Sequence, residues 1–103
     1  MPKLKVSIII VYNLAKKEVF DCLKSIQKIQ GVSFEVILVD NDKKNPVGKE
    51  LSKKFSWVRY LKSPRNIGYA RANNLGVAHA KGEYLLILNP DTIVYPDVLK
   101  RLI

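Results

Sequence analysis

The segment KVSIIIVY, residues 5–12, is the strongest indication of the fold in this sequence. It is almost continuously apolar and rich in β-branched side chains, which is typical of a strand buried on both faces of a parallel sheet. A helix is expected to follow such a strand before the chain returns to the sheet.

Four strand patterns alternate with four helix patterns along the chain. The strand patterns are residues 5–12, 34–40, 57–61 and 83–88. The helix patterns are residues 16–30, a stretch that begins at Pro46 after the expected N-cap Asn45, residues 68–80, and a short stretch that begins at Pro96. From the last helix we expect Leu99 and Leu102 or Ile103 to face inward.

This alternation predicts an α/β fold with three layers, in which helices cover both faces of a mostly parallel sheet. The sheet should have about four strands in the order 3-2-1-4. Ligands of such sheets bind beyond the carboxyl ends of the strands, near the switch in strand order. The fourth strand is left with an uncovered edge, which predicts self-association into a homo-oligomer.

Length and composition limit the class of protein. The 103 residues allow one domain, residues 1–103, and 48% hydrophobic with 26% charged residues is typical of a globular chain. The first apolar run is too short to cross a membrane, and its flanks do not match a signal peptide, so we expect a cytoplasmic protein. Cys22 is the only cysteine, which excludes an intrachain disulfide and a cysteine-rich zinc site.

The net charge of +9 is the most unusual property of the composition. A domain this basic attracts polyanions, phosphates or anionic lipid, so the inner face of a membrane is a second expected location. A solvated lysine-rich surface with no binding role would give the same net charge. The lysines are not interleaved with aromatic residues as in stacking platforms for single strands. A basic module that binds nucleic acid or another polyanion is therefore the alternative hypothesis.

Polar residues gather where three of the strands end. They are Tyr12 and Asn13 after the first strand, Asp40, Asn41 and Asp42 after the second, and Asn89 and Asp91 after the fourth. Tyr12 could stack on a base, Asp40 could accept hydrogen bonds from a base or ribose, and Asp91 is the oxygen ligand that Mg²⁺ or Mn²⁺ prefers. Packing at a strand end or capping of a turn would explain each residue equally well.

A second group of candidates surrounds the start of the third helix. The segment SPRNIG, residues 63–68, places Arg65 and Asn66 before a helix whose N-terminal amides attract anions, with Arg71 in its first turns. An exposed arginine is the plain alternative. His79 near the end of that helix is expected to interact with the helix dipole, and Cys22 to be a small buried hydrophobe.

Familiar nucleotide motifs are missing from the sequence. Neither G-x-G-x-x-G nor G-x-x-x-x-G-K-[ST] occurs, which excludes the usual dinucleotide fingerprint and the P-loop. A receiver-like scaffold would need an acidic pair after the first strand, where Tyr12 and Asn13 stand.

Three stretches resemble the family 2 inverting glycosyltransferases, which have the GT-A fold. They are VSIIIVYN (residues 6–13), EVILVDND (residues 35–42) and RNIGYARANNLGVAHAKGEYLLILNPDTIVYPD (residues 65–97), and the third looks most like the subgroup that includes rhamnosyltransferases. The resemblance implies a donor domain that binds a nucleoside diphosphate sugar with a divalent metal, for inverting transfer of the sugar to an acceptor hydroxyl.

The resemblance also implies roles for individual residues. Tyr12 and Asp40 would hold the base, with Asn13 and Asn41 shaping the same pocket. Asn66, Arg71 and Asn74 would line the ribose or phosphate side, although many relatives have a small residue at the position of Arg71. Asn89 and Asp91 match the ends of the D-x-D motif, whose last acid binds Mg²⁺ or Mn²⁺. Here Asn89 replaces the first acid.

Members of the family continue into an acceptor-binding half that supplies the general base. The 103 residues match the donor-binding part, so the resemblance assigns no catalytic residue to this chain.

Overall fold

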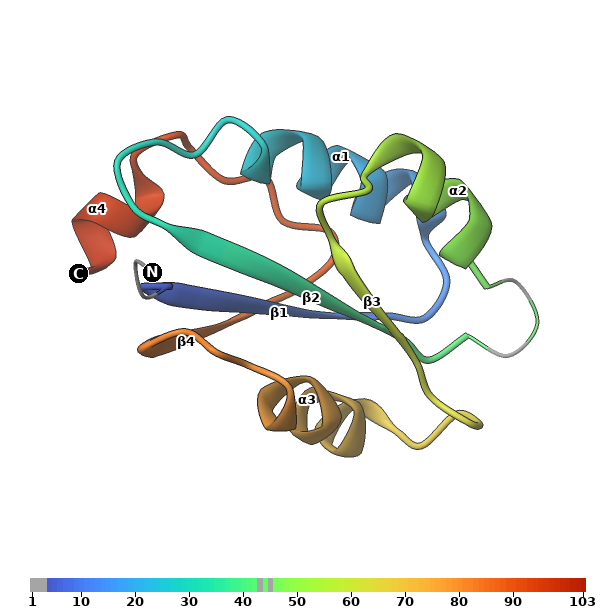
Figure 1. The fold of residues 1–103 in the computed structure, drawn as a ribbon. Helices are drawn as coiled ribbons and strands as arrows, with labels where there is room; N and C mark the ends of the chain where they lie inside the picture. The colour runs from blue at the N-terminus through green and yellow to red at the C-terminus, as the bar shows by residue number, and fades with distance from the viewer. Residues whose placement is uncertain (1–3, 43, 45) are drawn as a thin grey trace.

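The computed structural model describes residues 4–42, 44 and 46–103. Strands and helices alternate within these residues: β1 (Val6–Tyr12), α1 (Lys16–Ile26), β2 (Phe34–Asp40), α2 (Gly48–Lys54), β3 (Arg59–Lys62), α3 (Tyr69–Ala78), β4 (Tyr84–Leu88) and α4 (Val98–Leu102). All strand pairs are parallel, and the sheet has the order β3-β2-β1-β4 (Figure 1). The predicted fold class and strand order are confirmed.

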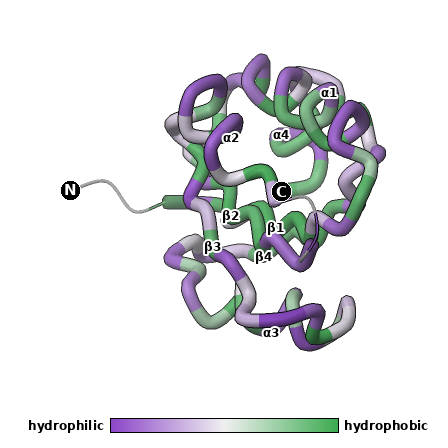
Figure 2. The backbone as a smooth tube through the Cα atoms, turned by 90° about the vertical axis from the view of Figure 1, so that its right-hand side faces the viewer, coloured by the Kyte–Doolittle hydropathy of each residue, from purple (hydrophilic) through white to green (hydrophobic). Residues whose placement is uncertain are grey.

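β1 lies in the middle of the sheet because its side chains are apolar on both faces. Ile8 and Ile10 pack in the core on the side of α1, while Ile9 and Val11 pack with Ala72 of α3 on the other side. α1, α2 and α4 lie over one face of the sheet and α3 over the other (Figure 1). Figure 2 shows the central strands as the most hydrophobic part of the backbone trace.

The register of β1 and β2 determines where the candidate site forms. Tyr12 and Asp40, the last residues of the two strands, lie opposite each other. The N–H of Asn41 donates to the carbonyl oxygen of Tyr12 at 2.8 Å, so the segments that follow β1 and β2 leave the sheet side by side. The loops after β1 and β2 therefore start side by side at the carboxyl edge.

A largely buried carboxylate, that of Glu35, links the amino ends of the strands, away from the candidate site. Glu35 accepts hydrogen bonds from Ser7 Oγ at 2.6 Å, from the Lys81 N–H at 2.7 Å and from Arg59 at 3.0 Å. Burial opposes ionisation of Glu35, but these three bonds outweigh it and hold the pKa of the carboxyl below its ordinary value. Gly82, the residue after Lys81, packs so closely against β1 that an added Cβ would lie 2.5 Å from the Ser7 nitrogen.

Several predicted boundaries need correction. α1 ends at Ile26 and not at residue 30, because the chain then forms single turns and the Gln30 N–H donates to Pro96 instead. Leu99 is buried as predicted, but Leu102 and Ile103 are 64% and 50% exposed, so the inward placement of either was wrong. α2 begins at Gly48, and the expected N-cap Asn45 lies outside the described residues.

β4 is an edge strand of the described sheet and carries exposed apolar side chains. Tyr84 and Leu85 are each 49% exposed and Ile87 is 43% exposed. An apolar hollow of about 400 Å³ lies between this strand and the end of α4. None of the described helices is both long enough and apolar enough to span a membrane.

Candidate functional site

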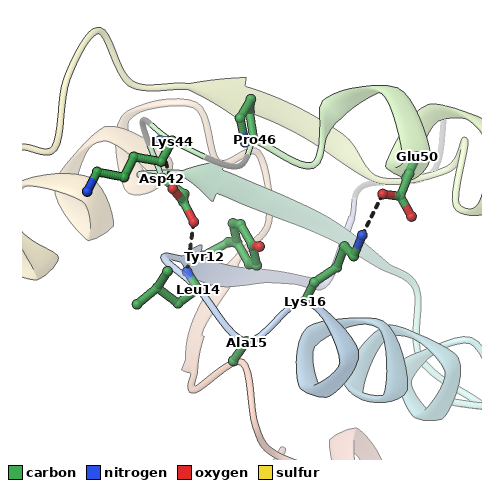
Figure 3. Close-up of a pocket in the computed structure, with 8 residues that line it drawn as sticks. All are labelled: Tyr12, Leu14, Ala15, Lys16, Asp42, Lys44, Pro46 and Glu50. Atoms are coloured by element: carbon green, nitrogen blue, oxygen red, sulfur yellow. Dashed lines mark hydrogen bonds and ion pairs between the residues drawn. The ribbon is translucent and has the colours of Figure 1, made fainter.

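A hollow of about 510 Å³ opens at the carboxyl ends of β1 and β2 (Figure 3). Its described lining mixes two cations, two carboxylates and apolar groups: Tyr12, Leu14, Ala15, Lys16, Asp42, Lys44, Pro46 and Glu50. Lys16 at the start of α1 and Glu50 of α2 form an ion pair of 2.7 Å at its mouth. That hydrogen bond with Lys16 is the main reason that the pKa of Glu50 is lowered.

The turn that forms one wall of this hollow has an uncommon backbone. Leu14 and Ala15 have φ values of 71° and 63°, in the left-handed region that residues other than glycine rarely adopt. Asp42 Oδ2 accepts the Leu14 N–H at 3.2 Å, and its Oδ1 accepts the Lys44 N–H at 3.0 Å. Asp42 thereby stabilises the loops on both sides of the hollow. Residues in this region of backbone space cluster at functional sites, which makes the wall a candidate part of one.

Tyr12 forms the inner wall of the hollow. Its side chain is 2% exposed and packs in the core cluster, so little of the ring is available to a ligand. Burial, and then the negative charges of Asp42, Asp40 and Glu50, raise the pKa of the Tyr12 hydroxyl. The hydroxyl therefore stays protonated and can serve only as a neutral polar group.

Asp40 lies beneath the hollow and is fully buried. Its Oδ1 accepts the Asp42 N–H at 3.0 Å, and its Oδ2 accepts the Val47 N–H at 2.9 Å and the Tyr60 hydroxyl at 2.6 Å. Burial and this bond to Asp40 raise the pKa of Tyr60. The Asp40 carboxylate thus has several partners within the protein, an arrangement that suits a structural role better than contact with a base.

A second hollow, of about 320 Å³, lies at the same edge on the α3 side of the sheet. Its described lining contains three of the predicted residues, Asn13, Asn41 and Asn66, together with Val11, Gly68, Tyr69 and Pro90. Asn13 follows Tyr12, and Asn41 precedes Asp42, so consecutive residues line the two hollows. The two hollows therefore flank the ends of the same two strands.

The predicted residues after β4 are exposed. Asn89 Oδ1 accepts a hydrogen bond from the Tyr69 hydroxyl at 3.2 Å, which joins it to the second hollow. Burial, and then the negative charge of Asp91, raise the pKa of the Cys22 thiol on α1 to about 11. Asp91, Arg71 and Asn74 are exposed and are not among the described residues that line either hollow.

The donor groups on this edge fit one kind of metal site. Among the described residues, no three His, Cys, Asp or Glu side chains are gathered around a possible ion. Asp91 offers a single exposed carboxylate, and Mg²⁺ commonly binds one or two protein carboxylates together with substrate phosphates. A lone exposed carboxylate such as that of Asp91 fits only an ion that takes most of its ligands from another molecule.

Sequence reasoning missed most of the first hollow. No pattern in the sequence sets Lys16, Lys44 or Glu50 apart from the other charged residues, and nothing in Leu14 or Ala15 predicts a left-handed backbone. Asp42 carried a usable signal, since it follows β2 at the carboxyl edge.

Two residues that line neither hollow are placed as predicted. Cys22 is a free, buried thiol. His79 is the C-cap of α3, and its Nδ1 lies 3.1 Å from the Leu75 carbonyl oxygen.

Solved structures share this fold over nearly the whole chain. TarS of S. aureus superposes with a TM-score of 0.85 at 22% identity, covering 96% of this chain and 31% of that one, and it has also been solved with UDP-GlcNAc. A mannosyltransferase from Pyrobaculum calidifontis, solved with GDP-Man and Mn²⁺, superposes with a TM-score of 0.80 at 19% identity, covering 95% and 31%. At these identities the likeness shows the fold alone.

Sequence comparison identifies the family. Glycosyltransferase GlyG of Streptococcus pneumoniae is 33% identical over 95 residues, which cover 89% of this chain and 31% of that protein. The chain spans 16% to 37% of the length of the curated relatives it matches. The family model described as Glycosyl transferase family 2 matches residues 7–103. With its fold and its polar carboxyl edge, the chain belongs to glycosyl transferase family 2.

Proposed function

We propose that this chain is a donor-binding part of a glycosyltransferase and that it binds a nucleoside diphosphate sugar together with Mg²⁺ or Mn²⁺. The observation that carries the proposal is the pair of hollows at the ends of β1 and β2, in a chain of this family. The structures of similar fold that were solved with UDP-GlcNAc and with GDP-Man and Mn²⁺ support the class of ligand.

Different parts of the proposed donor would occupy different parts of this edge. The base would enter the first hollow, with Tyr12 as its inner wall and Asp42 holding the loops around it. The sugar and diphosphate would lie along the edge toward Asn13 and Asp91. The exposed Arg71 and Asn74 would approach the same ligand from α3.

Asp91 would hold the metal ion, which would neutralise the departing diphosphate. For inverting transfer, an acceptor hydroxyl would attack the anomeric carbon directly. The general base for that step is not assigned to any residue of this chain.

Calorimetric titration with UDP, dTDP and GDP, each with Mn²⁺, tests the proposal. Asp42→Asn should weaken binding about tenfold, because it removes a carboxylate that orders the hollow. Asp21→Asn is the matched control, since Asp21 pairs with Lys17 on the outside of α1. Absence of binding at millimolar nucleotide, or equal effects of the two variants, would contradict the proposal.

The polyanion alternative rests on the charge of +9 alone. It predicts binding to DNA or RNA with a steep salt dependence that Asp42→Asn leaves unchanged. The same variants therefore separate the two hypotheses.

A further inference from the structure

Asn41 is buried at the end of β2, and its amide is used inside the protein. The residue is 2% exposed. Its Oδ1 accepts hydrogen bonds from Ser63 Oγ at 2.9 Å and from the Ile67 N–H at 3.0 Å. Its Nδ2 donates to Asn66 Oδ1 at 3.1 Å. These three bonds tie the end of β2 to the segment that precedes α3, and they leave little of the amide for a ligand.

Asn66 continues this connection to the start of α3. The oxygen that accepts from Asn41 also accepts the Gly68 N–H at 3.1 Å. Gly68 is the N-cap residue of α3 and has a φ of 83°, a conformation that favours glycine. Asn66 thereby helps to determine the direction in which α3 leaves the loop, and with it the position of Tyr69, the first residue of the helix.

Tyr69 completes a path across the carboxyl edge. Its hydroxyl donates to Asn89 Oδ1 at 3.2 Å, directly after β4. The Asn89 carbonyl oxygen in turn accepts the Thr92 N–H at 3.2 Å, which closes a turn around Asp91. Hydrogen bonds therefore run from the end of β2, through the start of α3, to the loop that carries Asp91.

We infer that Asn41, Asn66 and Tyr69 are positioning residues that hold the 89–91 loop in place relative to the base hollow. The inference rests on the proposed function for its consequence, because the loop would meet the diphosphate and its metal ion. Asn41 and Asn66 then act on the donor through Tyr69 and Asn89, in contrast to the direct contacts that the family resemblance implies for them.

A measurement without ligand tests the path itself. Asn66→Ala removes the oxygen shared by Asn41 and Gly68, whereas Asn66→Asp keeps an oxygen at that position. In amide ¹H–¹⁵N spectra, Asn66→Ala should shift the resonances of residues 89–92, which Asn66 does not contact in any described hydrogen bond. Asn66→Asp should largely restore them. Shifts confined to residues 41 and 63–69 in Asn66→Ala would overturn the inference.

A binding measurement tests the consequence. Tyr69→Phe removes one exposed oxygen and should leave the fold intact, while Tyr95→Phe, at a position that is 78% exposed, is the matched control. We expect Tyr69→Phe to weaken the affinity for UDP or GDP with Mn²⁺ about tenfold and to leave the affinity for uridine or guanosine unchanged. Equal losses for nucleoside and diphosphate, or no loss at all, would overturn the inference.

The two measurements separate the inference from the function. If the wild-type chain binds none of these nucleotides, the proposed function fails, and the ligand-free spectra still decide whether the path exists. If nucleotides bind but Asn66→Ala leaves residues 89–92 unshifted, the function stands and the positioning role is refuted.

Discussion

Replacing Asp40 by asparagine distinguishes a structural carboxylate from a base-binding one. The buried carboxylate accepts two backbone N–H groups, from Asp42 and Val47, and the Tyr60 hydroxyl. Asparagine offers one oxygen and one NH₂ group in the same space. Whichever way the amide is turned, its NH₂ faces one of the two N–H groups, and that buried donor loses its acceptor.

The expected cost follows from these bonds. An unsatisfied buried donor costs about 1–3 kcal/mol, and the remaining bonds weaken because charged acceptors are stronger than neutral ones. Together these effects lower the free energy of unfolding by about 3 kcal/mol. With a urea slope of about 1.5 kcal/mol per M, the midpoint of unfolding should fall by about 2 M.

Urea unfolding at neutral pH, followed by circular dichroism, is the assay, and Asp91→Asn is the control. Asp91 is exposed, so its variant should stay within about 0.5 kcal/mol of wild type. If Asp40→Asn keeps the wild-type midpoint but loses affinity for nucleotides, the carboxylate contacts the ligand, and the structural reasoning is refuted.

Three further predictions concern the strands. The lowered pKa of Glu35 stabilises the fold above its ordinary pKa of 4.5, and this stabilisation is lost as pH falls through the folded pKa. Glu35→Gln should therefore flatten the acid side of a plot of unfolding midpoint against pH, and an unchanged slope would contradict this. Gly82→Ala should lower stability by about 2–3 kcal/mol in the same assay, because the new Cβ meets the backbone of β1; a wild-type midpoint would show that the turn relaxes freely. Self-association through β4 remains a prediction, and light scattering should show oligomers of the wild-type chain. Ile87→Lys should abolish these oligomers, whereas the control Leu14→Lys, at another exposed apolar position, should not. A monomeric wild type would refute the prediction.

The fold was predictable because its signals are local and mutually consistent. The almost continuous apolar run of β1 requires burial on both faces, and this places the strand in the middle of the sheet with a helix layer on either side. Exact boundaries were less predictable. α1 stops before its apolar spacing ends, because Gln30 pairs with Pro96, a residue far away in the sequence.

The candidate site was predictable in place but only partly in detail. Parallel strands bring their carboxyl ends to one edge, so Asn13 and Asn41 could be expected to gather there, while Asn66 was predicted from its place before α3. Whether a carboxylate faces a ligand or the interior depends on donors that meet it from other elements. Asp40 and Asp42 are two residues apart, yet Val47 and Tyr60 reach the first, while Leu14 is held by the second.

The order of strands also has a consequence during synthesis. β1 is made first, but the neighbour on one of its sides, β4, pairs with it only from Tyr84 onward. After β1, β2 and β3 have left the ribosome, one edge of β1 therefore stays unpaired and exposed until the last fifth of the 103 residues emerges. Chaperones that shield apolar strands would be most useful to this chain during that interval.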